Sequence, residues 1–243
     1  MNSNTDYEYI RLEIDSSNRL NGDIYDFNVN ISNSFLGNDS IEESKLLLSE
    51  FSTANDMTNM NSYSKSLLFG TTQYFTFEEQ NYNSTQLIDY FNSNNNLGLT
   101  MSYNSQSENF TFYNPLGITY PINLTLNNYQ KDLLGFQNSS NNIGTTLSSD
   151  KPINLNYPKK IKIITKNVNL KSYNTQNGNN NILAVVKPNV QFGEIINFSN
   201  TLPVSTNTNF INEINLQLLD EYNNLITGKK TNYDMTLFLL NKL

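Results

Sequence analysis

The sequence predicts an all-β fold, an antiparallel β-sandwich, and three observations support this prediction. Several segments alternate apolar and polar residues with a period of two, which is typical of half-buried strands. About eleven such segments follow one another at short spacing, which favours a sandwich over alternating strands and helices. Only two stretches have the residue pattern of a helix, and both are short.

The alternation is clearest in residues 8–14, 24–31, 97–103 and 109–113, and the polar link at 104–107 joins the last two into a predicted hairpin. Further strands are predicted at residues 45–53, 72–79, 122–126, 160–168, 182–187, 211–219 and 233–240. Because side chains of a strand point to opposite faces in turn, one set should line the space between two sheets. This expected core contains Ile10, Leu12, Ile14, Phe27, Val29, Leu99, Met101, Phe110, Phe112, Ile214, Leu216 and Leu218.

The two predicted helices are short and lie between strands. Ser84 or Thr85 can cap a helix at residues 86–92, and residues 129–134 can form one turn that Gly135 ends. The remaining polar stretches are predicted to be surface loops. They are residues 33–44, 55–66, 138–156 and 172–181.

The composition limits the chemistry that the chain can perform. It has 243 residues and a formal net charge of -7, with neither Cys nor His. Thiolate nucleophiles, zinc sites built on Cys or His, and imidazole catalysis are therefore excluded. Acidic neighbours such as Asp220 and Glu221 point to opposite faces of a strand, so they do not converge on one substrate. We expect a non-enzymatic protein without cofactor, metal or small-molecule substrate, and a hydrolase is the weakest alternative.

No part of the sequence has the pattern of a membrane or export segment. The longest apolar runs, such as residues 182–186, are far shorter than the roughly 18 residues of a membrane-spanning helix. Residues 1–6 lack the positive start and apolar block of a signal peptide. The sequence therefore predicts no membrane span and synthesis in a cytoplasm.

One cluster of basic residues is a candidate contact site. On a strand, Lys160, Lys162 and Lys166 share the face opposite Ile161 and Ile163. One hypothesis is that these lysines protect an edge strand against aggregation. The other is a contact with an acidic partner subunit. Because the chain is acidic, with a pI of about 4.6, a protein partner is favoured over nucleic acid.

Three stretches resemble the minor capsid proteins of virophages and polinton-like viruses. The first is residues 14–19, Ile-Asp-Ser-Ser-Asn-Arg, which follow a predicted strand. The second begins with Tyr-Phe-Thr-Phe at residues 74–77, continues through the first helix and the hairpin, and reaches Leu-Leu-Gly-Phe at residues 133–136. The third is the ending, where the turn at residues 220–224 lies between two predicted strands.

This resemblance implies a jelly roll that acts as a penton. In that family the penton forms homopentamers that close the five-fold vertices of an icosahedral capsid and contact the major capsid protein. The chain is too short for two jelly rolls of eight strands each, which favours the penton over the major capsid protein. We therefore expect one domain over residues 1–243, with long loops or a small insertion within residues 138–181. Its expected location is the virion, at the capsid vertex, after synthesis in the host cytoplasm.

A second hypothesis is a carbohydrate- or receptor-binding jelly-roll module. Exposed Tyr and Asn side chains can stack on sugars and hydrogen-bond to them, and such a module requires a concave row of exposed aromatic residues. The predicted strands direct most Tyr side chains into the core, and the chain has no Trp, which sugar-binding sites favour. The capsid hypothesis is therefore preferred.

Overall fold

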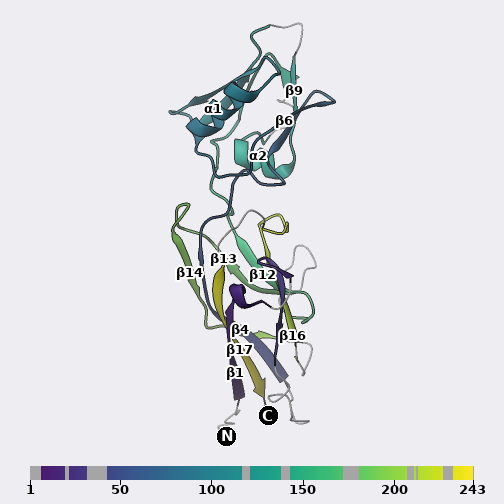
Figure 1. The fold of residues 1–243 in the computed structure, drawn as a ribbon, viewed down its shortest axis with the longest axis vertical. Coiled ribbons are helices and arrows are strands. Elements are labelled where there is room, and N and C mark those ends of the chain that lie inside the picture. Colours follow the sequence, from purple (N-terminus) through teal and green to yellow (C-terminus); the bar gives the residue numbers. More distant parts are fainter. Residues whose placement is uncertain are drawn as a thin grey trace. The chain divides into compact units, whose positions relative to one another are not determined.

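The computed structural model describes residues 7–19, 22–31, 43–116, 121–137, 143–171, 181–206, 211, 213–226 and 232–242 (Figure 1). Strands dominate these residues, and the strand pairings are antiparallel, which confirms the predicted all-β class. The chain divides into two compact units. Residues Met1–Asp56 and Pro158–Leu243 form the first, here called the sandwich unit, and Met57–Tyr157 form the second, here called the inserted unit.

The sandwich unit contains two sheets. In the first, the strand order is β1-β17-β4-β14, and β15 also pairs with β4. The second sheet has the order β13-β12-β16-β3-β2. The strands of the first sheet are β1 (Tyr7–Asp15), β4 (Glu43–Ala54), β14 (Ile195–Ser199), β15 (Val204–Ser205) and β17 (Tyr233–Lys242). Those of the second are β2 (Gly22–Asp23), β3 (Asp26–Asn30), β12 (Ile161–Thr165), β13 (Ile182–Val186) and β16 (Glu213–Leu219).

These strand orders are those of a jelly roll. When the eight main strands β1, β3, β4, β12, β13, β14, β16 and β17 are lettered B to I in chain order, the sheets become B-I-D-G and C-H-E-F. Consecutive strands lie in different sheets except E and F, which pair within one sheet, and this is the arrangement of the eight-stranded jelly roll. The inserted unit interrupts it in the chain between β4 and β12, the D and E strands.

The core of the sandwich unit lies between its two sheets. The Tyr233 ring packs against Phe27 at 5.8 Å and against Phe51 at 5.5 Å between ring centroids. Ile214 and Leu216 of β16 are fully buried, as the alternation of that strand predicts. β16 and β17 are central strands, and their buried apolar side chains contribute to the core between the two sheets.

The inserted unit has two sheets of its own and both α-helices. Its sheets have the orders β10-β9-β5-β6 and β11-β8-β7. The strands are β5 (Ser66–Phe69), β6 (Gln73–Thr76), β7 (Thr100–Asn104), β8 (Asn109–Tyr113), β9 (Ile122–Thr125), β10 (Ile143–Gly144) and β11 (Thr146–Ser148). Rings of Phe69, Phe91 and Phe112 pack together, with centroid distances from 5.3 to 6.1 Å. This aromatic cluster gives the unit a core distinct from that of the sandwich.

Each α-helix begins with a capping box that the sequence contains. In α1 (Ser84–Asn94), the Asn83 side chain accepts a hydrogen bond from the Gln86 N–H, and the Gln86 side chain accepts one from the Asn83 N–H. The cap is therefore Asn83, one residue before Ser84 and two before Thr85, the two predicted caps. Helix α2 (Asn128–Leu134) ends at Gly135, as predicted, with a φ of 80°. A Cβ there would lie 2.1 Å from the Lys151 carbonyl oxygen, so the position requires glycine.

The predicted strands are all present, although their ends differ by a few residues. The segments that alternation missed are β5, β10, β11 and β14, together with the two-residue strands β2 and β15. Most of these are too short to show a period of two. The predicted loops 33–44 and 172–181 lie almost entirely outside the described residues.

The predicted core residues are divided between the two units. Leu99, Met101, Phe110 and Phe112 belong to the inserted unit, so they do not line the space between the sandwich sheets as predicted. Leu12, Val29 and Leu99 are half-buried, and the other nine are buried. Periodicity alone identifies burial but does not tell which sheet a strand joins. Whether both units unfold as the single expected domain stays a prediction.

Candidate functional site

The three candidate lysines lie on or next to β12, which is an interior strand. It pairs with β13 on one side and with β16 on the other. The hypothesis that these lysines protect a sheet edge is therefore wrong, because β12 has no open edge. Alternation predicted the strand correctly, but only the pairing determines whether a strand is central.

Lys166 forms an ion pair within the sandwich unit. Its ammonium nitrogen lies 2.7 Å from Asp26 Oδ1, and Gln217 donates a hydrogen bond to Asp26 Oδ2 at 2.9 Å. Burial by itself raises the pKa of the Asp26 carboxyl, but the hydrogen bonds from Lys166 and Gln217 outweigh it and hold the pKa below its usual value. The contact joins the end of β12 to β3 across β16.

Lys162 is also engaged within the chain. Its ammonium donates to the Glu221 carbonyl oxygen at 2.9 Å and to Asn223 Oδ1 at 2.7 Å. Burial lowers the pKa of Lys162, while the nearby Asp220 charge opposes that shift. Asp220 itself is fully buried and accepts hydrogen bonds from the backbone N–H groups of Tyr222 and Asn224. Through these hydrogen bonds, Lys162 links the turn at residues 220–224 to β12.

The Glu221 carboxylate lies beside the backbone where the chain returns from the inserted unit. Its Oε2 accepts hydrogen bonds from the backbone N–H groups of Lys159 at 3.1 Å and Lys160 at 3.4 Å. Burial raises the pKa of the Glu221 carboxyl. Glu221 thus organises the backbone at the start of β12.

Lys160 differs from the other two candidates. It is exposed, and among the described residues only its backbone N–H has a hydrogen-bond partner. The structure therefore leaves Lys160 as the candidate whose ammonium can reach another molecule without first breaking an internal contact. A subunit contact through Lys160, Lys162 and Lys166 stays a prediction.

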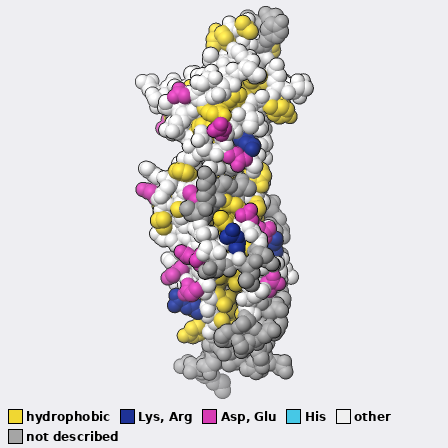
Figure 2. Space-filling model, viewed as in Figure 1, with side chains coloured by type: hydrophobic (Ala, Val, Ile, Leu, Met, Phe, Trp, Pro, Cys, Tyr) yellow, Lys and Arg dark blue, Asp and Glu magenta, His cyan; other side chains and the backbone are white. Residues whose placement is uncertain are grey.

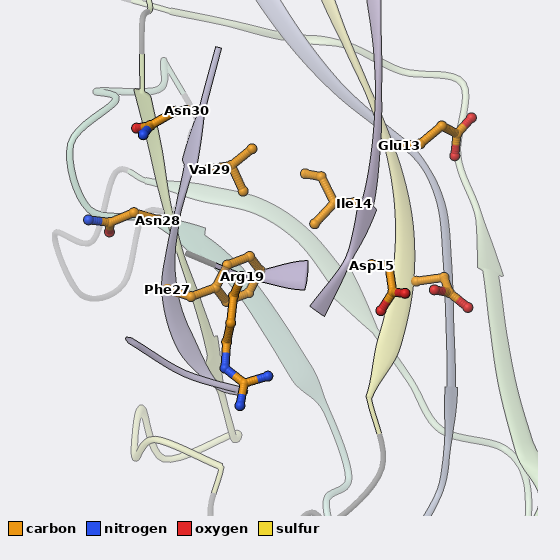
Figure 3. A pocket seen from close by; sticks show the side chains of 9 residues that line it. Glu13, Ile14, Asp15, Arg19, Phe27, Asn28, Val29 and Asn30 are labelled. Carbon is orange, nitrogen blue, oxygen red and sulfur yellow. The ribbon is translucent and has the colours of Figure 1, made fainter. Parts of the chain in front are cut away.

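A cleft of about 450 Å³ lies between β1 and β3, and sequence reasoning did not find it (Figure 3). Ile14 and Val29 point toward one another across it, and Phe27 lies beside them. Asp15, Asp234, Glu13 and Arg19 also line it. The cleft thus combines apolar side chains of the core with a margin that carries charges of both signs.

Local hydrogen bonds hold one end of this cleft in place. Asp15 caps the short 3-10 turn Ser16–Asn18 by accepting from the Ser17 N–H at 2.7 Å and the Ser17 hydroxyl at 2.6 Å. These two bonds lower the pKa of the Asp15 carboxyl. Arg19 donates to the carbonyl oxygens of Ser16 at 2.6 Å and Gly22 at 3.2 Å. The Ile-Asp-Ser-Ser-Asn-Arg run, noted in the sequence only for its resemblance, therefore shapes the cleft.

The described part of the chain contains no group of three or more Asp, Glu, His or Cys side chains that could hold a metal ion. No helix within those residues is long and apolar enough to cross a membrane.

Comparisons with known proteins found similar chains among solved structures. No family model matches the sequence, and no curated protein matches it. Among solved structures, the chain is similar to the mavirus penton protein, with 13% identity, a TM-score of 0.47, and coverage of 98% of this chain and 100% of that one. It is also similar to a chain in the structure of the Sputnik virophage, with 14% identity, a TM-score of 0.40 and 98% of each chain covered.

Proposed function

We propose that this chain is a viral capsid protein of the penton type, which forms pentamers at the five-fold vertices of an icosahedral shell and contacts the major capsid protein. The observation that carries the proposal is the B-I-D-G and C-H-E-F strand order of the sandwich unit. Jelly rolls with this arrangement occur in viral capsid proteins, although also in lectins and cupins. The motifs that resemble virophage minor capsid proteins favour the capsid role among these.

The architecture suits a subunit that works by assembling. Among the described strands, three end strands of the two sheets pair on one side only: β1 and β14 in the first sheet and β13 in the second. Identical subunits around an axis meet through two different surfaces, and such heterologous contacts close into a ring. No chemical step is required of the protein in this role, and its location would be the capsid vertex of the virion.

The sugar-binding alternative requires a concave row of exposed aromatic side chains. Among the described residues, the tyrosines exposed by nearly half or more are Tyr9, Tyr74 and Tyr113. Tyr9 belongs to the sandwich unit, whereas Tyr74 and Tyr113 lie in different sheets of the inserted unit. These residues supply no row on a single sheet, so the capsid role is preferred.

The test is co-assembly with the major capsid protein of the same virus. We expect light scattering to give a particle of five times the 27.8 kDa chain mass at high protein concentration. In addition, electron microscopy of shells assembled with and without the chain should show density at the vertices only when it is present. A chain that stays monomeric and is not incorporated into shells would refute the proposal. If the free chain is a monomer but is incorporated at the vertices, the pentamer forms only during shell assembly.

A further inference from the structure

A hollow of about 370 Å³ lies in the inserted unit between helix α1 and residues 80–82, here called the α1 hollow. From the helix, the residues Gln86, Asp89, Tyr90 and Ser93 line it, at the spacing that places side chains on one helix face. Pockets that bind small molecules have volumes from roughly 300 Å³ upward. The α1 hollow is therefore large enough for a small ligand.

The lining of the α1 hollow consists entirely of side chains that form hydrogen bonds. Of its eight residues, four carry an amide, three carry a hydroxyl, and Asp89 carries a carboxylate. Among these described residues there is no aliphatic side chain and no Lys or Arg. A drug-like pocket is mostly apolar, so this lining differs from it. It suits a ligand with many hydroxyl groups, because amides and hydroxyls both donate and accept hydrogen bonds.

Two tyrosine rings contribute the aromatic part of the α1 hollow. The rings of Tyr82 and Tyr90 lie 5.6 Å apart, and each lies 5.8 Å from the ring of Phe77, which is 1% exposed. The buried Asn59 side chain accepts a hydrogen bond from the Tyr82 N–H at 2.9 Å and donates one to the Tyr82 carbonyl oxygen at 2.8 Å. The rings are thus held in place before a ligand binds, which lowers the entropic cost of binding.

The Tyr82 hydroxyl is buried and has no hydrogen-bond partner among the described residues. Burial raises the pKa of this hydroxyl. The Gln80 side chain and the Glu78 backbone lie near enough to oppose that shift, but neither bonds the hydroxyl with suitable geometry. An unsatisfied buried hydroxyl costs free energy, and a ligand group that reaches it removes this cost.

The charges at the α1 hollow are negative. Asp89 is exposed, and no hydrogen bond or ion pair of its side chain is found within the described part of the chain. Glu78 lies close enough for its charge to act on the Tyr82 hydroxyl. On the face that Figure 2 shows, the surface around α1 is mostly uncharged, with isolated acidic side chains. Phosphates, sulfates and carboxylates are therefore repelled, whereas a neutral ligand is not.

We propose that the α1 hollow binds a neutral saccharide. The Asp89 carboxylate accepts hydrogen bonds from neighbouring sugar hydroxyls, and the Tyr90 ring contacts the apolar CH face of the sugar. The exposed Gln80 side chain moves aside, so that a further sugar hydroxyl reaches the Tyr82 hydroxyl. The site recognises one sugar by hydrogen bonds, so it does not need the row of exposed aromatic side chains considered above. It adds a binding activity to the capsid role and does not replace it.

The first experiment tests the full chain on an array of immobilised glycans that contains neutral glycans and their sialylated and sulfated forms. We expect binding to neutral glycans and weaker binding to the matched anionic forms, because the lining of the α1 hollow has a carboxylate and no Lys or Arg. If no glycan is bound, or if only the anionic forms are bound, the inference is wrong.

The second experiment measures the affinity of single variants for the neutral glycan that binds best on the array, by isothermal titration calorimetry. Tyr82→Phe removes the unpartnered hydroxyl, and Asp89→Asn removes the carboxylate. Each should weaken binding by about tenfold, the effect of losing one or two hydrogen bonds. Tyr113→Phe, at an exposed tyrosine of the same unit that does not line the hollow, is the matched control and should bind like the wild type.

Thermal melting distinguishes a binding role of these side chains from a structural one. Tyr82→Phe should melt at the wild-type temperature or above it, because it removes an unsatisfied buried hydroxyl. Asp89→Asn should melt like the wild type, because Asp89 is exposed. If Tyr82→Phe proves less stable, the affinity of Asp89→Asn decides. Wild-type affinity in both variants would show that the glycan binds elsewhere and would refute the inference.

These experiments do not depend on the penton function. The strand order that carries the penton proposal belongs to the sandwich unit, whereas the α1 hollow lies within the inserted unit. A chain that binds no glycan but enters shells at the vertices would refute this inference alone. A chain that binds neutral glycans but never enters shells would refute the penton function alone.

Discussion

The Lys166 ammonium lies 2.7 Å from the Asp26 carboxylate and joins two strands that β16 separates. Both side chains remain partly exposed, so water screens the pair. A double-mutant cycle with Lys166→Gln and Asp26→Asn should therefore give a coupling energy of about 1 kcal/mol or less. The coupling should shrink as salt is added. Chemical denaturation of the four proteins measures it, and a coupling of several kcal/mol would show that the pair behaves as a buried one.

The same pair also predicts a pH dependence. The folded-state pKa of Asp26 lies below the ordinary value of 3.8. The pair therefore contributes stability above about pH 3.8, and this contribution is lost as the pH falls through the folded-state pKa. Chemical denaturation at several pH values between 6 and 3 should show that the free energy of unfolding falls more steeply with decreasing pH for the wild type than for Asp26→Asn. Parallel curves for the two proteins would contradict the assignment.

Lys160 is the lysine best placed for an intermolecular contact, and its replacement separates assembly from folding. Lys160→Gln should leave the melting temperature unchanged, because its side chain makes no described contact within the chain. If it meets an acidic surface of an adjacent subunit, the variant should assemble more slowly, and the difference from the wild type should narrow as salt rises. Lys151→Gln, at an exposed lysine of the inserted unit, is the control. Equal assembly rates at all salt concentrations would exclude the contact.

Tyr233 carries a buried hydroxyl that has no hydrogen-bond partner among the described residues. The residue is 1% exposed. Because an unsatisfied buried hydroxyl destabilises the folded state, Tyr233→Phe should raise the free energy of unfolding by about 1 kcal/mol. The rings of Phe27 and Phe51 would keep their contacts. Thermal melting measures the change, and a clear loss of stability would indicate that the hydroxyl is bonded after all.

Phe112 and Leu216 are fully buried in different units. Replacing either with Ala should cost about 2 to 5 kcal/mol, since the substitution leaves a cavity. If the chain is one cooperative domain, the protein should melt in a single transition, and each variant should lower the temperature of that transition. Differential scanning calorimetry would reveal two transitions if the units unfold separately, and Phe112→Ala should then shift only the one that belongs to the inserted unit.

The sequence by itself determined the strand content and the burial of most core positions. Alternation at Ile10 and Ile14, or at Ile214 and Leu216, requires an extended chain with one buried face, and this local relation does not depend on neighbouring strands. The Gly135 stop of α2 was equally visible, because the left-handed backbone that ends a helix favours glycine, although the close approach of Lys151 to Gly135 was not visible. Missed strands such as β14 show only weak alternation, since an end strand buries few of its side chains.

Only the tertiary structure decided which strands are neighbours and what each polar residue contacts. Phe112 and Leu216 have the same period-two environment in the sequence, yet they belong to different units, because pairing depends on chain segments far apart. For the same reason β12 is central rather than an edge, and Lys162 and Lys166 have partners more than fifty residues away: Asn223 and Asp26. The cleft between β1 and β3 arises where two sheets end side by side, a relation that periodicity along one strand does not contain.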